Sequence, residues 1–409
     1  MSDRPWYEID LPEQLMSPSI LVYPDRIDEN LCRMIALVGN VDQWRPHVKT
    51  HKLPQVVTMK RRLGITRFKA ATIAEAEMTA TAGGEDVLLA YPIVGPNIER
   101  LLNLIDAFPA TKFSALVDDH ETLRRIDEHA QRRGVRVSLM LDLDVGMHRT
   151  GFPLSASGTG FSSSASGTDF SSSASGTGSS SSAAGIDRAL RFYESMIDRP
   201  GIHALGLHAY DGHIHESDPN TLRSTIEEAF APLWQLRDRI VAAGHPSPKL
   251  VLAGTPTSRH LAEIGDVEVG AGTTVLWDAG QPRLSPDLDF TPAAVVVARV
   301  VSRPSTSDAN RTGNGLLCLD LGHKAVASEM PAPRVAWLNL PDAVEVMHSE
   351  EHLVVQSPAA GSIPVGTLLY GLPTHICPTM ALHQDVGVVR DRRVVERWNV
   401  VARDRRIRF

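Results

Sequence analysis

Residues 86–144 read DVLLAYPIVGPNIERLLNLIDAFPATKFSALVDDHETLRRIDEHAQRRGVRVSLMLDLD, and this stretch decides the fold. Short apolar runs over 86–94, 113–118 and 137–144 are typical of buried strands. The two segments between these runs repeat apolar residues at helical spacing. Strands that alternate with helices predict a parallel sheet, because each helix carries the chain back to the same end of the sheet.

The same alternation continues on both sides of this stretch. Upstream, ILVYP at 20–24 is strand-like and precedes a helical pattern. Downstream, strand-like runs at 202–210 and 249–255 flank a long helical pattern over 221–244. Six or more such units in about 250 residues favour a (β/α)8 TIM-type barrel over an open sheet. We therefore expect a barrel domain over residues 18–287.

From residue 288 onward the chain changes to short β-rich runs separated by glycine and proline. Helical spacing is absent from this part, which predicts a C-terminal all-β domain over 288–409. The N-terminal segment, 1–17, is expected to pack on that domain. We also expect the β domain to contribute to the active site, because ligands favour domain interfaces.

A segment rich in serine and glycine interrupts the barrel at 154–185. The unit SASGT begins at Ser155, Ser164 and Ser173. Such residues bury too little apolar area to offset the entropy of ordering, which predicts a flexible insertion that touches neither ligand nor active site. Regular patterning resumes on both sides, so the insertion is a loop inside one domain.

Composition excludes several classes of protein. The 409 residues carry a net charge of −7, which gives no support to non-specific nucleic-acid binding. No apolar run reaches the ~18–20 residues that span a bilayer. The first residues hold acidic side chains and no apolar core of a secretory signal. Three widely spaced cysteines make a disulfide framework improbable, and a cytoplasmic protein is expected.

The first candidate site is RPHVKTHK, residues 45–52. In a strand, alternate residues share a face, so His47, Lys49 and His51 would point the same way. A lysine among other cationic groups has more of its amine in the free form, as a Schiff-base lysine requires. A solvated basic strand is the alternative.

Two further clusters follow barrel strands. DLDVGMHRTG, residues 142–151, places Arg149 after a strand end, where it could hold a carboxylate or ring oxygen or form only a surface salt bridge. GLHAYDGHIH, residues 206–215, packs several polar rings together. From this second cluster we take His213 as the candidate acid or base and Tyr210 as a candidate ligand-binding residue. Structural roles are the alternative for each histidine.

Two glycine–threonine segments lie late in the expected barrel. Gly254 and Thr255 belong to AGTPT, and Gly272 and Thr273 belong to GAGTT. Backbone amides without side-chain bulk, together with a hydroxyl, can hold a phosphate after the last barrel strands. A simple turn explains each segment equally well.

The last candidate site is GLPTHICPTMALHQ, residues 371–384. His375 and Cys377 are two residues apart, so both would face one side of an extended segment. Imidazole and thiolate suit Zn²⁺, and two protein ligands leave positions open for a substrate. A buried cysteine beside a loop histidine is the alternative.

Taken together, VKTHK, the glycine–threonine segments and PTHICP resemble the D-threonine aldolase and D-serine dehydratase family, pyridoxal-phosphate enzymes of the alanine racemase fold type. The resemblance implies a barrel followed by a β domain, acting as a homodimer on a small D-amino acid. It implies that Lys49 binds pyridoxal 5′-phosphate covalently and that His375 and Cys377 bind one divalent metal, Zn²⁺, Mn²⁺ or Mg²⁺. It assigns the phosphate and ring contacts to Gly254, Thr255, Gly272, Thr273, Tyr210 and Arg149.

The resemblance leaves the reaction open. HAYDGHI, TIAEAEM and LLAYPIVGPN look like the D-threonine aldolase branch, which cleaves D-β-hydroxy-α-amino acids to glycine and an aldehyde. Aldolases of this group usually pair histidine with aspartate at the metal, whereas the dehydratases pair it with cysteine, as Cys377 does here. Dehydration to a 2-oxo acid and ammonia is therefore the alternative. Racemisation and non-catalytic cofactor binding are further alternatives.

Overall fold

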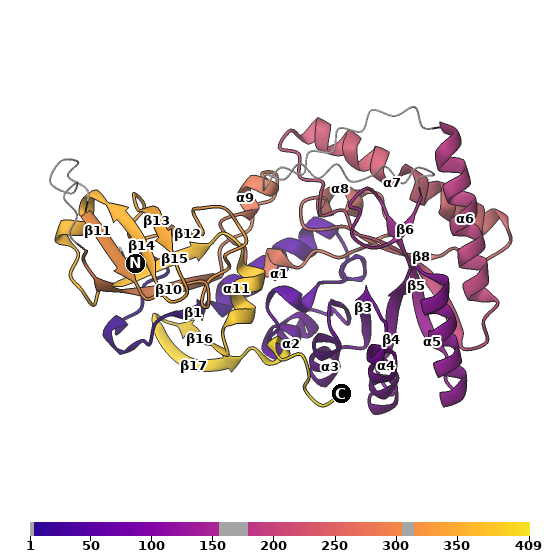
Figure 1. The fold of residues 1–409 in the computed structure, drawn as a ribbon, viewed down its shortest axis with the longest axis horizontal. Helices are drawn as coiled ribbons and strands as arrows, with labels where there is room; N and C mark the ends of the chain where they lie inside the picture. Colours follow the sequence, from indigo (N-terminus) through magenta and orange to yellow (C-terminus); the bar gives the residue numbers. More distant parts are fainter. Residues whose placement is uncertain (1–3, 155–178, 305–314) are drawn as a thin grey trace. The chain divides into compact units, whose positions relative to one another are not determined.

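The computed structural model describes residues 4–154, 179–304 and 315–409 (Figure 1). The chain forms two compact units. The barrel unit comprises Ile35–Val48, Val57–Gly272 and Arg405–Phe409. The β unit comprises Met1–Met34, Lys49–Val56 and Thr273–Asp404.

Parallel strands form the wall of the barrel unit, in the order β2-β3-β4-β5-β7-β8-β9, with the short β6 beside β5. Their side chains are largely buried, as expected of a parallel sheet that is covered on both faces. The strands are β2 (Arg67–Ala70), β3 (Asp86–Pro92), β4 (Lys112–Val117), β5 (Val137–Asp144), β6 (Phe152–Pro153), β7 (Ile202–Ala209), β8 (Lys249–Leu252) and β9 (Glu268–Val269).

The segment between Trp44 and His47 closes this wall. Trp44 forms a parallel bridge to Val269 of β9, and His47 forms one to Lys69 of β2. The Arg45 amide donates to the Val269 carbonyl at 3.0 Å. The two edge strands are therefore joined through one short extended segment, and the expected barrel followed by an all-β domain is confirmed.

Helices α4, α5 and α6 lie outside the parallel strands (Figure 1). Local signals explain their ends: in α5, the Asp119 side chain accepts from the Thr122 amide at 2.7 Å, and Gly134 ends the helix in the left-handed conformation. No helix among the described residues is long and apolar enough to cross a membrane. Helix α1 (Pro24–Val38) lies mostly in the β unit. The other helices are α2 (Pro54–Arg62), α3 (Ile73–Thr81), α4 (Pro96–Ala107), α5 (His120–Arg133), α6 (Ser179–Ile197), α7 (Pro219–Ala242) and α8 (Ser258–Glu263).

An ion-pair cluster is buried in the barrel unit around Arg45, whose side chain is only 2% exposed. Its Nη1 donates to Asp86 Oδ1 at 2.6 Å, and its Nε contacts Glu268. Arg67 Nη1 also donates to Glu268, at 2.8 Å. Arg45 belongs to the RPHVKTHK motif, but these contacts make it a structural residue of the barrel wall.

Replacing Arg45 with methionine is expected to lower the free energy of unfolding by about 3–5 kcal/mol, because Asp86 loses its partner while it stays largely buried. Denaturant titration of the two proteins measures this difference. The matched control is Arg223→Met, which breaks an exposed pair with Glu263 and should cost less than about 1 kcal/mol. Equal effects of the two substitutions would contradict a stabilising role for the buried cluster.

The β unit contains a sheet in the order β13-β14-β11-β10-β1-β16-β17, with β15 pairing with β10 and β12. The run at 20–24 was expected in the barrel, and this expectation is wrong. Its strand β1 (Ser19–Val22) pairs antiparallel with β10 and parallel with β16. The other strands are β10 (Ala294–Ser302), β11 (Gly315–Leu319), β12 (Val335–Trp337), β13 (Val344–His348), β14 (Leu353–Ser357), β15 (Leu368–Pro373), β16 (Asp385–Arg390) and β17 (Arg393–Asn399).

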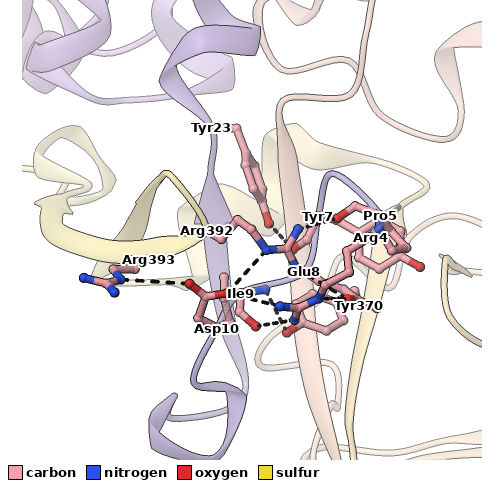
Figure 2. A network of polar contacts seen from close by, with 10 residues as sticks. All are labelled: Arg4, Pro5, Tyr7, Glu8, Ile9, Asp10, Tyr23, Tyr370, Arg392 and Arg393. Carbon is pink, nitrogen blue, oxygen red and sulfur yellow. Dashed lines mark hydrogen bonds and ion pairs between the residues drawn. The ribbon is translucent and has the colours of Figure 1, made fainter. Parts of the chain in front are cut away.

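The N-terminal segment is held within this unit by polar and aromatic contacts (Figure 2). Tyr23 Oη donates to the Tyr7 carbonyl at 2.5 Å, and the Tyr7 and Tyr370 ring centroids are 5.3 Å apart. Arg392 Nη1 donates to the Pro5 carbonyl at 3.1 Å. Residues from the first and last parts of the sequence therefore share one network.

Most of the serine-rich segment expected to be flexible, residues 155–178, lies outside the described residues. Its last part is helical, since α6 begins at Ser179. The expectation of an irregular loop up to residue 185 is therefore wrong for 179–185. Extending an existing amphipathic helix backward costs less than starting a new one, and this accounts for the difference.

Candidate functional site

Lys49 lies in a single turn of 3₁₀ helix, Val48–Thr50, and not in a strand. The expectation that His47, Lys49 and His51 share one strand face is therefore wrong. This segment pairs with the barrel strands only as far as His47, and the chain then turns. The ring of His51 is buried, and its Nδ1 accepts from the Leu53 amide at 3.1 Å. Lys49 itself is half-buried.

Cys377 lies in the β unit close to Lys49 and two threonines. Its Sγ is 3.2 Å from Thr50 Oγ1 and 3.7 Å from Thr273 Oγ1. Burial alone would raise the pKa of Cys377, but the hydrogen bond and charge of His375, followed by the charge of Lys49, outweigh it and lower the pKa. The surroundings of this thiol therefore favour the thiolate, the form that binds metals.

His375 is brought to Cys377 by a helix start and not by an extended segment. It is the N-cap of α11 (Ile376–Leu382), and Cys377 lies in the first turn. The expected extended geometry is therefore wrong, although the two side chains do interact electrostatically. Burial would lower the pKa of His375, but Cys377 and then Glu329 outweigh it and raise the pKa of His375 to about 9.

Two carboxylates that sequence reasoning missed support this pair. Glu329 Oε1 lies 2.6 Å from His375 Nδ1. Asp278 is buried, and its oxygens accept from the amides of Ile376 at 2.9 Å, Gln281 at 3.0 Å and Gly280 at 3.1 Å. Glu329 thus orients the imidazole and Asp278 fixes the start of α11. No motif marks either residue, because each lies more than 40 positions from His375.

A buried histidine–aspartate pair lies at the carboxyl ends of β5 and β7 in the barrel unit. His208 Nδ1 is 2.6 Å from Asp142 Oδ1, and both side chains are less than 5% exposed. His208 Nε2 is buried and has no hydrogen-bond partner among the described residues. Burial, followed by the charge of Lys69, lowers the pKa of His208 to about 4, so the ring is neutral near pH 7.

The Tyr210 ring lies between glycines and cations in the same unit. The guanidinium carbon of Arg149 is 4.7 Å from the ring centroid, and Lys69 Nζ is 5.9 Å from it. The structure therefore brings Arg149 and Tyr210 together. Lys69, which is buried, was missed because a single lysine in a short strand carries no motif. A small pocket beside the ring is lined by Asp142, Leu143, Met147, Arg149, Thr150 and Tyr210.

His213 lies next to the turn at Gly146. A Cβ on that glycine would be 3.1 Å from His213 Nε2. Its Nδ1 is buried without a hydrogen-bond partner in the described part of the chain. Burial lowers the pKa of His213 despite the opposing charges of Asp211 and Asp144. The ring is therefore available as a neutral proton acceptor.

The two glycine–threonine segments differ in what they offer a ligand. The Gly254 amide donates to Asp211 Oδ1 at 2.6 Å, so it is already used. A Cβ on Gly272 would lie 2.6 Å from the His47 carbonyl oxygen, so only glycine permits this close approach. Thr255 is buried, and no hydrogen bond between described residues uses its amide. Thr273 lies in the β unit beside Cys377.

Two family models match the chain. "Alanine racemase, N-terminal domain" matches residues 22–162, and "Putative serine dehydratase domain" matches residues 293–389. The first covers much of the barrel unit and the second covers most strands of the β unit.

Several characterised proteins are similar over nearly the whole chain. The D-threonine aldolase of Arthrobacter sp is 24% identical over 95% of this chain and 92% of its own. The D-threo-3-hydroxyaspartate dehydratase of Delftia sp. (strain HT23) is 23% identical over 90% and 92%. The crystal structure of D-threonine aldolase from Filomicrobium marinum matches with a TM-score of 0.78 at 22% identity, over 97% of this chain and 98% of that chain.

A structure of D-threo-3-hydroxyaspartate dehydratase, as a cysteine-to-alanine mutant in the metal-free form, matches with a TM-score of 0.75 at 22% identity, over 95% and 98% of the two chains. The two family models occur in the same order as the barrel and β units. The chain therefore contains the two domains that these family models describe, and over nearly its whole length it is similar to a D-threonine aldolase and to a D-threo-3-hydroxyaspartate dehydratase.

Proposed function

We propose that this protein is a pyridoxal-phosphate- and divalent-metal-dependent lyase that cleaves D-β-hydroxy-α-amino acids to glycine and an aldehyde. The observation that carries the proposal is the cluster of Lys49, His375 and Cys377 in the β unit, with Glu329 behind the imidazole. Family members are pyridoxal-phosphate enzymes, and characterised relatives act on D-threonine and on D-threo-3-hydroxyaspartate.

We assign the covalent attachment of the cofactor to Lys49. Its phosphate is assigned to Thr255, Gly272 and Thr273, with Gly254 shaping the turn, and its ring to Tyr210 and Arg149. The unused Thr255 amide supports this assignment, because a buried polar atom without a partner is costly unless a ligand satisfies it. When bound, the cofactor serves as an electron sink for the substrate α-carbon.

We assign the metal to His375 and Cys377. An imidazole nitrogen and a thiolate are a suitable donor set for a divalent metal, and a carboxylate that hydrogen-bonds the other ring nitrogen of the histidine, as Glu329 does here, is typical of such sites. With two protein ligands, a metal at this site would keep positions open for a substrate. Such a metal would polarise the substrate's β-hydroxyl group.

The proton transfer is assigned to His213. Its buried Nδ1 has no partner within the described ranges, and its pKa is lowered, foremost by burial. A neutral imidazole accepts a proton at neutral pH and returns it afterwards. Glu329 holds the His375 ring, and Thr50 keeps the Cys377 sulfur hydrogen-bonded.

Dehydration to a 2-oxo acid and ammonia is the second candidate. The observation that favours it is the cysteine at position 377, since dehydratases of this family pair histidine with cysteine. Dehydration and aldol cleavage need the same cofactor and metal, so the cluster alone does not distinguish them.

A product assay tests both candidates. The purified protein is supplied with pyridoxal phosphate and with Zn²⁺, Mn²⁺ or Mg²⁺, and is then given D-threonine, D-serine or D-threo-3-hydroxyaspartate. Glycine and an aldehyde are the expected products. A 2-oxo acid with ammonia would establish the dehydratase, and interconversion of enantiomers without a metal would establish a racemase.

A further inference from the structure

The Asp211 carboxylate joins both ends of one loop in the barrel unit. Asp211 follows β7 and is only 1% exposed. Its Oδ1 accepts from the Gly254 amide at 2.6 Å, and its Oδ2 accepts from Thr257 Oγ1 at 2.5 Å. Both partners lie in the loop that follows β8. A single side chain thus sets the position of the loop over residues 253–257.

This loop needs such support because its backbone is strained. Ala253 has a φ of 75°, which side chains with a Cβ rarely adopt. A Cβ on Gly254 would lie 3.2 Å from Asp211 Oδ1 and 3.4 Å from the Tyr210 ring. The loop therefore passes close to Asp211 and Tyr210, and the carboxylate holds it there.

The supported loop leaves one donor unused. The Thr255 carbonyl accepts from the Ser258 amide at 3.3 Å and from its hydroxyl at 2.8 Å. The Thr255 amide, in contrast, has no partner in the described part of the chain, and the residue is buried. A buried amide held in a fixed direction is suited to an anion.

The charge of Asp211 is stabilised by hydrogen bonds from Thr257 and Gly254 and by the positive charge of Lys69. Burial raises the pKa of Asp211, while the hydrogen bonds from Thr257 and Gly254 and the charge of Lys69 oppose that rise. Both carboxylate oxygens accept short hydrogen bonds from the 253–257 loop. Asp211 therefore acts through the loop and does not touch a reacting atom.

We propose that Asp211 positions the 253–257 loop so that Thr255 binds a phosphate monoester, the phosphate group of pyridoxal phosphate. This inference rests on the proposed function, because it takes the cofactor as given. It adds that the selectivity for the phosphorylated cofactor depends on a carboxylate that does not itself contact the phosphate.

Comparing two cofactor forms tests this inference. The apparent dissociation constants of pyridoxal phosphate and of pyridoxal, which lacks the phosphate, are measured by spectral titration of cofactor-stripped full-length protein. In Asp211→Ala, the preference for the phosphorylated form is expected to fall at least tenfold, whereas the affinity for pyridoxal stays within about twofold. Asp211→Asn, which retains one acceptor oxygen, should fall between this variant and the parent protein.

Two further variants make the test specific. Thr257→Val keeps the size of the side chain and removes only the hydroxyl that binds Asp211, so it should lower the preference by about threefold, and it decides the outcome if Asp211→Ala does not fold. Asp144→Asn is the matched control, because Asp144 Oδ1 accepts from the Gly146 and His148 amides at 2.9 and 3.0 Å in a different loop. The control should leave the preference unchanged.

The outcomes separate the two proposals. Equal weakening of both cofactor forms in Asp211→Ala and Thr257→Val, or an unchanged preference in both, would overturn the role of Asp211 and leave the proposed function intact. A parent protein that binds neither form would overturn the proposed function and this inference with it.

Discussion

Replacing Lys49 with alanine is expected to abolish lyase turnover, by about a thousandfold or more, and to end covalent attachment of the cofactor. A catalytic amine contributes both a covalent bond to the cofactor and a proton-transfer group, and alanine can supply neither. Borohydride reduction followed by peptide mapping measures the attachment directly. The parent protein should carry the reduced cofactor on the peptide that contains Lys49.

Lys52 provides a matched control for this experiment. It lies three residues away in the same motif, is also half-buried, and its Nζ is 3.4 Å from the Ala402 carbonyl oxygen. Lys52→Ala should retain the reducible cofactor. If the Lys49→Ala protein still carried cofactor that borohydride fixes to another lysine, such as Lys69, our assignment would be incorrect.

Removal of the metal ligands is expected to have the second largest effect. His375→Ala and Cys377→Ala should each lose stoichiometric metal and at least a hundredfold in lyase turnover, because the substrate's β-hydroxyl is then no longer polarised. Chelation of the parent protein should have the same effect on turnover and leave the visible absorbance of the bound cofactor in place. Elemental analysis and a product assay, performed on the same samples, measure both quantities.

Two variants calibrate this experiment. Cys318→Ala removes another partly buried cysteine of the β unit, and it should retain both the metal and the activity. Glu329→Gln keeps the size of the side chain behind His375 and should weaken metal binding by about 10–100-fold without abolishing it. Full lyase activity of metal-free protein, or of His375→Ala, would show that the pair is structural.

The barrel could be predicted because its signal is local. In the stretch from β3 to β5, each strand contains a short, mostly apolar run and each helix repeats apolar residues along one face. These periods follow from strand and helix geometry, so a window of about 10–15 residues is sufficient to recognise them. The assignment of β1 failed because a fully buried apolar strand looks alike in a parallel and in an antiparallel sheet.

In the candidate site, too, features encoded by neighbouring residues could be predicted, and features that depend on distant segments could not. Lys49, His375 and Cys377 lie in short motifs, so their residue types and spacing made them candidates, and the family resemblance then gave them their expected roles. The motifs did not predict the backbone conformation. Lys49 lies in a turn of 3₁₀ helix, and His375 is the N-cap of a helix. These conformations depend on where the neighbouring segments end, which no motif encodes.

The sequence alone determined the order of a barrel and a β domain, and the lysine, histidine and cysteine that carry the proposed chemistry. Tertiary structure alone decided which residues support them. These hydrogen bonds join residues far apart in the sequence: Asp142 and His208 are separated by 66 positions, Glu329 and His375 by 46, and Asp211 and Gly254 by 43. The physical reason is that periodicity and motif spacing act within one element, whereas a carboxylate finds its hydrogen-bond donors among whichever segments the folded chain brings next to it.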